Sequence, residues 1–353
     1  MSRLKIKFVE DWQEVESCET APALLAEMEG RLFQLKPDLA VHHDFGKVGP
    51  VDCPIAYDAL SNMAYRYVSP PNLARRDYSE LRAFDLETQA SKPILRLPLN
   101  QWVLWQLEWI EGPSEDAGQL FGLLAADRPA DDRVIIEHRL FALGARDGQM
   151  KMRPLCRDAY RPLAFNRKRR ELIFSGAEGI YLVNLRGVRV AMMPQTDTTG
   201  HGASFDPSGA PRAVLGGDGI FIWDFESSES RRLTRAGRNP VWDASRNGIW
   251  YQESSSDLYF FNLDSGESTK VFDVQGNRNP ELWYSRPVKQ TKCGRYLAVA
   301  VTAKKLKGLS RKANATGSRE RVYVHEHALY ILDLEQQVYW SREGFMNQMC
   351  WVE

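Results

Sequence analysis

The sequence predicts an all-β protein: a β-propeller of seven four-stranded blades, with the ring closed by pairing of N- and C-terminal strands. Three observations support this prediction. Short apolar runs alternate with turn residues, the pattern repeats at about 40 residues, and strand-like segments remain at both ends of the chain. Of the 353 residues, 43% are hydrophobic, which is enough to bury a large core.

Three consecutive segments share one order of features: an aromatic residue, a polar turn, an apolar run, a tight turn, a second apolar run, and then Asn or Asp before Leu or Phe. The aromatic residues are Phe165, Phe205 and Trp242, spaced by 40 and then 37 residues. The second apolar runs, IYLVNL, IFIWDF and LYFFNL, are too short for helices and rich in strand-favouring residues. The turns GAEG and GGDG supply the glycines that hairpins need.

Other parts of the chain fit the same unit with longer insertions. The six complete blades are expected at residues 53–98, 102–155, 160–197, 202–235, 238–275 and 285–343. Residues 1–50 would supply the three outer strands of a seventh blade, beginning with RLKIKFVE, and residues 346–353 its innermost strand. Pairing the termini would remove an exposed sheet edge. Residues 1–353 are therefore expected to form a single domain, with six or eight blades as the alternatives.

One segment, RRLTRAGRNPVWDASRNGIWYQESSSDLYFFNLDSG, resembles the WD40-like blades of TolB-type propellers. The residues that match the pattern of this family are Leu233, Thr234, Gly237, Pro240, Trp242, Leu258, Tyr259 and Leu263. The sequence departs from the pattern at Asn247 and Asn262, where Asp is usual, and the dipeptides of true WD repeats do not recur in register. The resemblance implies a bacterial-type propeller, and this fold hosts many functions.

Composition narrows the classes of function. Lys plus Arg equals Asp plus Glu at 46 each, which makes nucleic acid an unlikely partner. Five scattered cysteines without a CxxC pair indicate neither a disulfide framework nor a zinc module. No N-terminal leader is recognisable, and no run reaches the ~18 apolar residues of a membrane span. These features predict a cytoplasmic protein with no cofactor and no membrane contact.

Four long insertions follow one another around the predicted ring: residues 303–326, 11–30, 69–79 and 127–136. They are expected on one arc of one face, where a rigid scaffold would present them. Residues 11–30 are acidic and include APALLAEME, a candidate short helix, whereas residues 303–326 are basic with a flexible centre. The candidate partner-binding residues are Arg75, Arg76, Lys304, Lys305, Lys307, Arg311, Lys312, Arg319 and Arg321, and for an aromatic rim Trp283 and Tyr284.

The leading hypothesis is a scaffold that binds a protein partner through loops 11–30, 69–79 and 303–326. A second hypothesis is a hydrolase or lyase with a metal or carboxylates in the central channel. Its first suspects are His42, His325, His327 and Asp58, although these short runs are a weak metal signal. No G-x-S-x-G elbow occurs, and GGDG joins two strands, which excludes a P-loop there. A third hypothesis is glycan or peptide binding on the aromatic rim, although most tryptophans should pack between blades.

Overall fold

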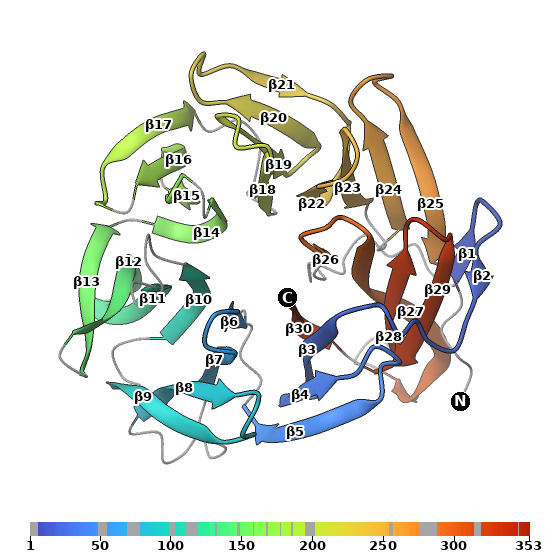
Figure 1. Ribbon diagram of the computed structural model, residues 1–353, viewed down its shortest axis with the longest axis horizontal. Coiled ribbons are helices and arrows are strands. Elements are labelled where there is room, and N and C mark those ends of the chain that lie inside the picture. The colour runs from blue at the N-terminus through green and yellow to red at the C-terminus, as the bar shows by residue number, and fades with distance from the viewer. Residues whose placement is uncertain are drawn as a thin grey trace.

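The strands of the computed structural model form seven sheets arranged around a central axis (Figure 1). The structure describes residues 6–48, 55–68, 78–98, 103–110, 119–130, 133–146, 149–157, 159–166, 169–176, 178–184, 186–194, 202–253, 257–274, 288–313, 319–344 and 346–353. Within these ranges only the backbone is described for residues 78–79, 97–98, 103–163, 194, 304–325 and 346–347. The prediction of an all-β propeller is confirmed.

Six sheets take four strands in chain order, from the inner strand to the outer one. Their strands are β6 (Ala56–Asp58), β7 (Met63–Val68), β8 (Tyr78–Asp85) and β9 (Ser91–Pro98); β10 (Val103–Ile110), β11 (Gln119–Ala130), β12 (Arg133–Arg146) and β13 (Gln149–Arg157); β14 (Ala159–Asn166), β15 (Glu171–Gly176), β16 (Gly179–Asn184) and β17 (Arg189–Pro194); β18 (Ala203–Phe205), β19 (Arg212–Gly216), β20 (Ile220–Asp224) and β21 (Ser230–Arg232); β22 (Arg238–Trp242), β23 (Gly248–Glu253), β24 (Asp257–Asn262) and β25 (Ser268–Val274); and β26 (Val288–Gln290), β27 (Tyr296–Ala313), β28 (Arg319–Asp333) and β29 (Val338–Glu343).

The remaining sheet joins the two ends of the chain. Its inner strand is β30 (Met346–Val352), followed by β3 (Ala23–Met28), β4 (Arg31–Leu35) and β5 (Val41–Lys47). The C-terminal strand pairs antiparallel with β3 along its length. The last strand of the chain therefore closes the ring by pairing with a strand from the N-terminal part.

The expectation of an insertion with a short helix at residues 11–30 is wrong. Residues 23–28 form β3, which a two-residue turn, Glu29–Gly30, joins to β4. Both turn residues have positive φ, 51° and 74°, as a tight hairpin turn requires. β3 is buried on both faces, and such a continuous apolar run gives no period that separates strand from helix.

The expectation that RLKIKFVE belongs to the closing sheet is also wrong. Here β1 (Ile6–Phe8) pairs antiparallel with β25, and β2 (Gln13–Glu14) pairs parallel with β29, so the N-terminal segment runs along the rim of two neighbouring sheets (Figure 1). The ring of Phe8 lies 4.5 Å from that of Tyr339 and 5.6 Å from that of Phe272. Burial of this aromatic ring between two sheets stabilises the strand at the rim.

The repeated Asn or Asp at the end of each unit has a structural role. Its side-chain oxygen accepts backbone N–H groups of the following turn, as Asp224 does from Glu226 and Ser227 at 3.0 and 2.9 Å. The equivalent turn residues are Asp85, Asn184, Asn262 and Asp333. The repeat recognised in the sequence is therefore a repeat of turn chemistry as well as of strands.

Tryptophans fill the space between sheets, but they differ in hydrogen bonding. Trp250 is buried and donates its indole N–H to Asp243 at 2.7 Å. Trp223 is fully buried and its indole N–H has no acceptor. Because a buried polar group without a partner contributes no net stabilisation, the two indoles should respond differently to the same substitution.

We expect Trp250→Phe to lower the free energy of unfolding by about 1–3 kcal/mol more than Trp223→Phe. The first change removes the donor from a buried carboxylate, whereas the second removes a donor that bonds to nothing. Urea unfolding followed by circular dichroism measures both variants against the unsubstituted protein. Equal losses for the two variants would contradict the assignment.

Candidate functional site

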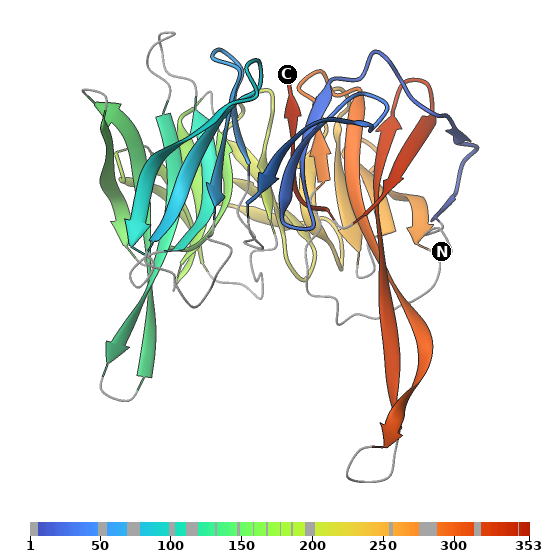
Figure 2. The same cartoon turned by 90° about the horizontal axis from the view of Figure 1, so that it is seen from below.

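Two hairpins extend far beyond their sheets. β27 pairs with β26 only over residues 297–299, yet its pairing with β28 continues to Ala313 opposite Arg319. Likewise, β11 pairs with β10 only as far as Ala125, while its pairing with β12 continues to Ala130 opposite Arg133. Figure 2 shows both hairpins projecting from the face opposite the C-terminus. These hairpins are the most prominent departures from a plain disc.

The β27–β28 hairpin carries a strong positive charge in its projecting part. Residues 304–325 contain seven of the 46 Lys and Arg residues and one of the 46 Asp and Glu residues, which is a net charge of +6. The other residues of the chain therefore carry a net charge of −6. The seven cations are the predicted Lys304, Lys305, Lys307, Arg311, Lys312, Arg319 and Arg321.

The strands of the basic segment reach close to its centre: β27 continues to Ala313 and β28 begins at Arg319. The expected flexible centre, residues 312–320, lies mostly outside the described residues and stays a prediction. The register places Lys304 opposite His325 and Lys305 opposite Val324. The local composition favours a loop, but backbone hydrogen bonds between two strands can hold charged residues in an extended hairpin.

The predicted arc of insertions fits the two hairpins, which project from one face with two sheets between them, but fails at residues 11–30. The sheets that bear the two hairpins are separated by two sheets on one side of the ring and by three on the other. Residues 11–30 form β2, β3 and their connections rather than an insertion on the hairpin face. Arg75, Arg76, Trp283 and Tyr284 lie outside the described residues, so the second loop and the aromatic rim stay predictions.

The histidines proposed as metal ligands lie in different surroundings. His42 is exposed on β5, and His327 on β28 has its Nδ1 2.9 Å from the hydroxyl of Thr302 on β27. His325 lies in the part of the hairpin whose backbone alone is described. Within the described parts of the chain, no group of three or more His, Cys, Asp or Glu side chains could hold a metal ion.

Asp58, the suspected channel acid, caps a turn. It is buried at the end of β6, where its carboxylate accepts the Leu60 N–H at 3.1 Å and the Ser61 hydroxyl. Asp206 and Asp243 do the same at the corresponding turns of their sheets, accepting backbone N–H groups at 2.8 Å. The carboxylate of Asp58 therefore stabilises the fold locally, as the repeated position implies.

One cluster of reactive side chains escaped the sequence analysis. The hydroxyl of Thr20 lies 3.2 Å from Sγ of Cys18 and 2.5 Å from the hydroxyl of Tyr296. The buried carboxylate of Asp333 lies 4.0 Å from the thiol and binds the Arg295 guanidinium, with a shortest distance of 2.7 Å. No local signal could reveal this cluster, because Cys18 and Tyr296 are 278 residues apart.

The environment changes the acidity of two of these groups in opposite directions. Burial disfavours ionisation of Cys18, but hydrogen bonds from Thr20 and Tyr296 outweigh it, and the pKa of the thiol is lowered. Burial raises the pKa of the Tyr296 phenol to about 12. Tyr296 is therefore a neutral hydrogen-bond donor at physiological pH beside a partly exposed thiol.

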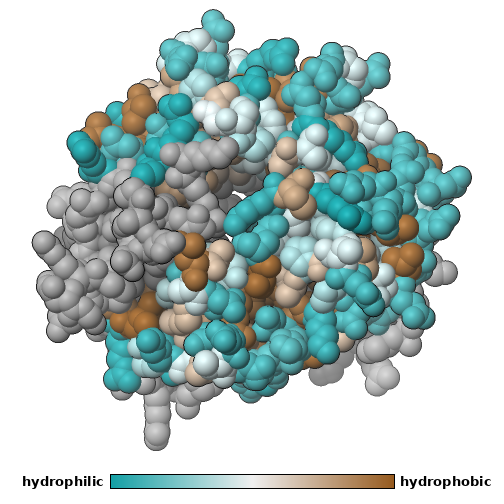
Figure 3. Space-filling model, in the orientation of Figure 1, coloured by the Kyte–Doolittle hydropathy of each residue, from teal (hydrophilic) through white to brown (hydrophobic). Residues whose placement is uncertain are grey.

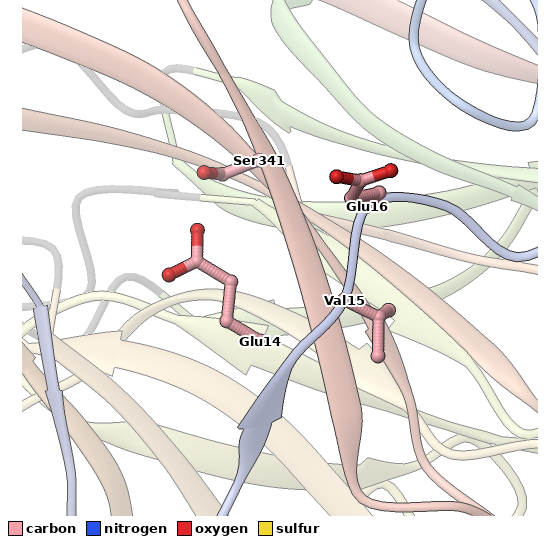
Figure 4. A pocket seen from close by; sticks show the side chains of 4 residues that line it. All are labelled: Glu14, Val15, Glu16 and Ser341. Atoms are coloured by element: carbon pink, nitrogen blue, oxygen red, sulfur yellow. The ribbon is translucent and has the colours of Figure 1, made fainter.

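A shallow pocket lies at the rim, where the N-terminal segment passes β29. It is lined by Glu14, Val15, Glu16 and Ser341, and Figure 4 shows the Glu14 carboxylate pointing towards the Ser341 hydroxyl. The ring face that bears the C-terminus is mostly hydrophilic, with apolar side chains scattered over it (Figure 3). The pocket lining offers two carboxylates and one hydroxyl.

One solved structure, with a TM-score of 0.51, supports the fold. No family model matches the chain, and no curated protein sequence matches it. Among solved structures, TolB from Acinetobacter baumannii is similar over 84% of this chain and 67% of its own, with a TM-score of 0.47 and 13% identity. A candidate 6-phosphogluconolactonase from Bacteroides uniformis is similar over 86% of this chain and 96% of its own, with a TM-score of 0.51 and 12% identity. In the described part of the chain, no helix is long and apolar enough to cross a membrane.

Proposed function

We propose that this propeller is a scaffold that binds an acidic surface of a partner protein through the β27–β28 hairpin. The observation that carries the proposal is a hairpin of net charge +6 that projects from one face of a chain with no net charge. A concentrated positive charge attracts an acidic surface and accelerates its encounter. The paired strands that carry these residues extend away from the disc.

The distribution of charge favours a protein partner over a nucleic acid. The hairpin is basic, but the other residues carry a net charge of −6. A duplex carries one negative charge per ~1.7 Å of its axis, so a duplex lying across the disc would approach acidic surface as well as the hairpin. An acidic patch on a protein is limited in extent, so it can contact the hairpin without approaching the rest of the disc.

The similarity to a candidate lactonase supports the fold rather than that activity, because only 12% of residues are identical. The carboxylates of Asp58, Asp206 and Asp243 are engaged in turns between strands. No observation in the described residues favours the enzymatic hypothesis over the scaffold.

Neutralising three lysines of the hairpin tests the proposal. We expect Lys304→Gln, Lys305→Gln and Lys307→Gln together to weaken binding of a fluorescent 20-residue polyglutamate peptide by about tenfold at low salt. This corresponds to roughly 0.5 kcal/mol per exposed charge pair. The dissociation constant is measured by fluorescence anisotropy, and its dependence on salt should decrease in the variant.

A matched control removes three exposed lysines elsewhere: Lys36→Gln, Lys47→Gln and Lys92→Gln. This variant should bind the peptide as the unsubstituted protein does. A second variant deletes residues 304–325 and joins Ala303 to Glu326, which are register partners, through an Asn-Gly turn. Equal weakening by both lysine triples would overturn the proposal, and tighter binding of a 20-base-pair duplex than of the peptide would replace the protein partner with a nucleic acid.

A further inference from the structure

The outer strand β17 exposes an unusual amount of apolar surface. Six large hydrophobic residues are exposed among the described side chains, and three of them lie at this strand or beside it: Val188 at 56%, Val190 at 49% and Met192 at 42%. As the last strand of its sheet, β17 pairs with β16 on one side only. Unpaired N–H and C=O groups on such an edge can hydrogen bond to a further strand.

The same molecule already uses its outer edges in this way. β1 adds a fifth strand to the edge of β25, and its apolar Ile6 and Phe8 pack into the core between sheets. Between them, Lys7 lies directly opposite Asp273 of the edge strand. At the edge of β25, the added strand therefore carries apolar side chains and a charge opposite to that of the edge residue that it faces.

Other uncovered edges carry features that discourage addition. β9 contains Pro93 in its interior, where it has no N–H to donate, whereas the proline of β17, Pro194, is the last residue of that strand. All three residues of β21 (Ser230–Arg232) are polar and exposed. The charged side chains of Arg31 and Asp44 pair across β4 and β5 at another edge, with Arg31 Nε 3.1 Å from the carboxylate. Among the outer strands whose side chains are described, β17 alone combines an uncovered edge with a run of exposed apolar residues.

We propose that the outer edge of β17 binds an extended segment of a partner protein as an added strand, with apolar side chains and an Asp or Glu opposite Arg189. Arg189 is expected to set the charge preference, by analogy with the register at β25, where Lys7 lies opposite Asp273 although the carboxylate of Asp273 also binds Lys270. Its guanidinium lies 4.2 Å from the centre of the Tyr181 ring on the neighbouring strand β16, which restricts the position of the charge. Its carboxylate neighbour, Glu178, is 4.0 Å away and 74% exposed, a geometry that gives a weak ion pair.

This surface is separate from the β27–β28 hairpin, so the two proposals can fail independently. The expected binding mode is main-chain pairing with a short segment, because the exposed apolar residues follow one strand and do not form a broad patch. A second copy of this chain pairing β17 to β17 is the competing occupant, and the experiment below separates the two.

Two synthetic peptides probe the edge: residues 4–11 of this chain, which include β1, and the same peptide carrying Lys7→Glu. We expect the full-length protein to bind the glutamate peptide about threefold to fivefold more tightly than the lysine peptide, as measured by fluorescence anisotropy. In the Arg189→Glu protein the preference should invert. In the Met192→Lys protein both peptides should bind more weakly, because a lysine on an edge strand opposes addition.

Arg231→Glu on the exposed edge of β21 is the matched control and should leave the preference unchanged. Circular dichroism and thermal unfolding verify that each variant is folded. A preference that survives Arg189→Glu would show that the peptide binds elsewhere, for example by displacing β1, and would overturn the proposal. Light scattering that shows a dimer dissociated by Met192→Lys would replace the partner segment with a second copy of the chain.

Discussion

Arg66→Ala is expected to lower the free energy of unfolding by about 3–5 kcal/mol. Arg66 lies on β7 and pairs with Glu27 on β3, so the ion pair joins the closing sheet to its neighbour. Both side chains are buried, with 0% and 1% exposure. Removing the cation leaves a buried carboxylate without this ion pair, which costs more than the pair contributes. Urea unfolding monitored by tryptophan fluorescence measures the loss.

The double variant Arg66→Met, Glu27→Leu is the control for this prediction. It removes both charges and keeps apolar volume, so it should recover most of the stability lost in Arg66→Ala. Glu27→Leu alone should be strongly destabilising, because it removes the carboxylate that neutralises a fully buried guanidinium. If the double variant is as unstable as the sum of the two single variants, the loss reflects packing rather than an isolated charge.

A chain that ends at Gly344 is expected to lose cooperative folding. It lacks β30, which forms the inner edge of the closing sheet and contributes the buried Met349 and Trp351. The indole N–H of Trp351 also donates to the backbone of Lys289 at 2.9 Å, which links this sheet to the next. Loss of two such core side chains costs about 2–5 kcal/mol each, comparable to the roughly 5–15 kcal/mol stability of a whole domain. Near-ultraviolet circular dichroism and the urea transition report the outcome.

Removal of residues 1–9 is the matched control at the other end of the chain. It deletes only β1, a rim strand, and should lower stability by a few kcal/mol through loss of the partly buried Phe8 while cooperative unfolding is retained. A synthetic peptide of residues 345–353 should restore the native spectrum of the chain that ends at Gly344. Cooperative unfolding of that chain without the peptide would contradict the role assigned to β30.

The local features of this protein follow from short stretches of sequence. The runs IYLVNL, IFIWDF and LYFFNL are strands, and the Asn or Asp that closes each repeat caps a turn. Both depend on interactions between residues a few positions apart, namely β-branched side chains in extended backbone and side-chain oxygens that bond to nearby N–H groups. The candidate cations of the basic hairpin could also be identified from composition, because charge is a property of each residue.

The placement of segments required the tertiary structure. APALLAEM matched a helix as well as a strand, and it forms β3 because it lies between β30 and β4. β1 pairs with the outer strand β25 and not with the closing sheet, because Phe8 packs against Phe272 and Tyr339 there. The contact between Cys18 and Tyr296 also required the tertiary structure, because the two residues are 278 positions apart.

Residue types and their spacing therefore specify strands, turns, the repeat and the local charge, since each is an interaction of short range. They do not specify which edge a strand joins or on which side of the ring a hairpin projects. Those outcomes depend on contacts between residues far apart in the chain. The arrangement that forms is the one whose buried apolar surface and other contacts give the lowest free energy. The apolar edge of β17 is such an outcome, because Val188, Val190 and Met192 are exposed only by their place in the fold.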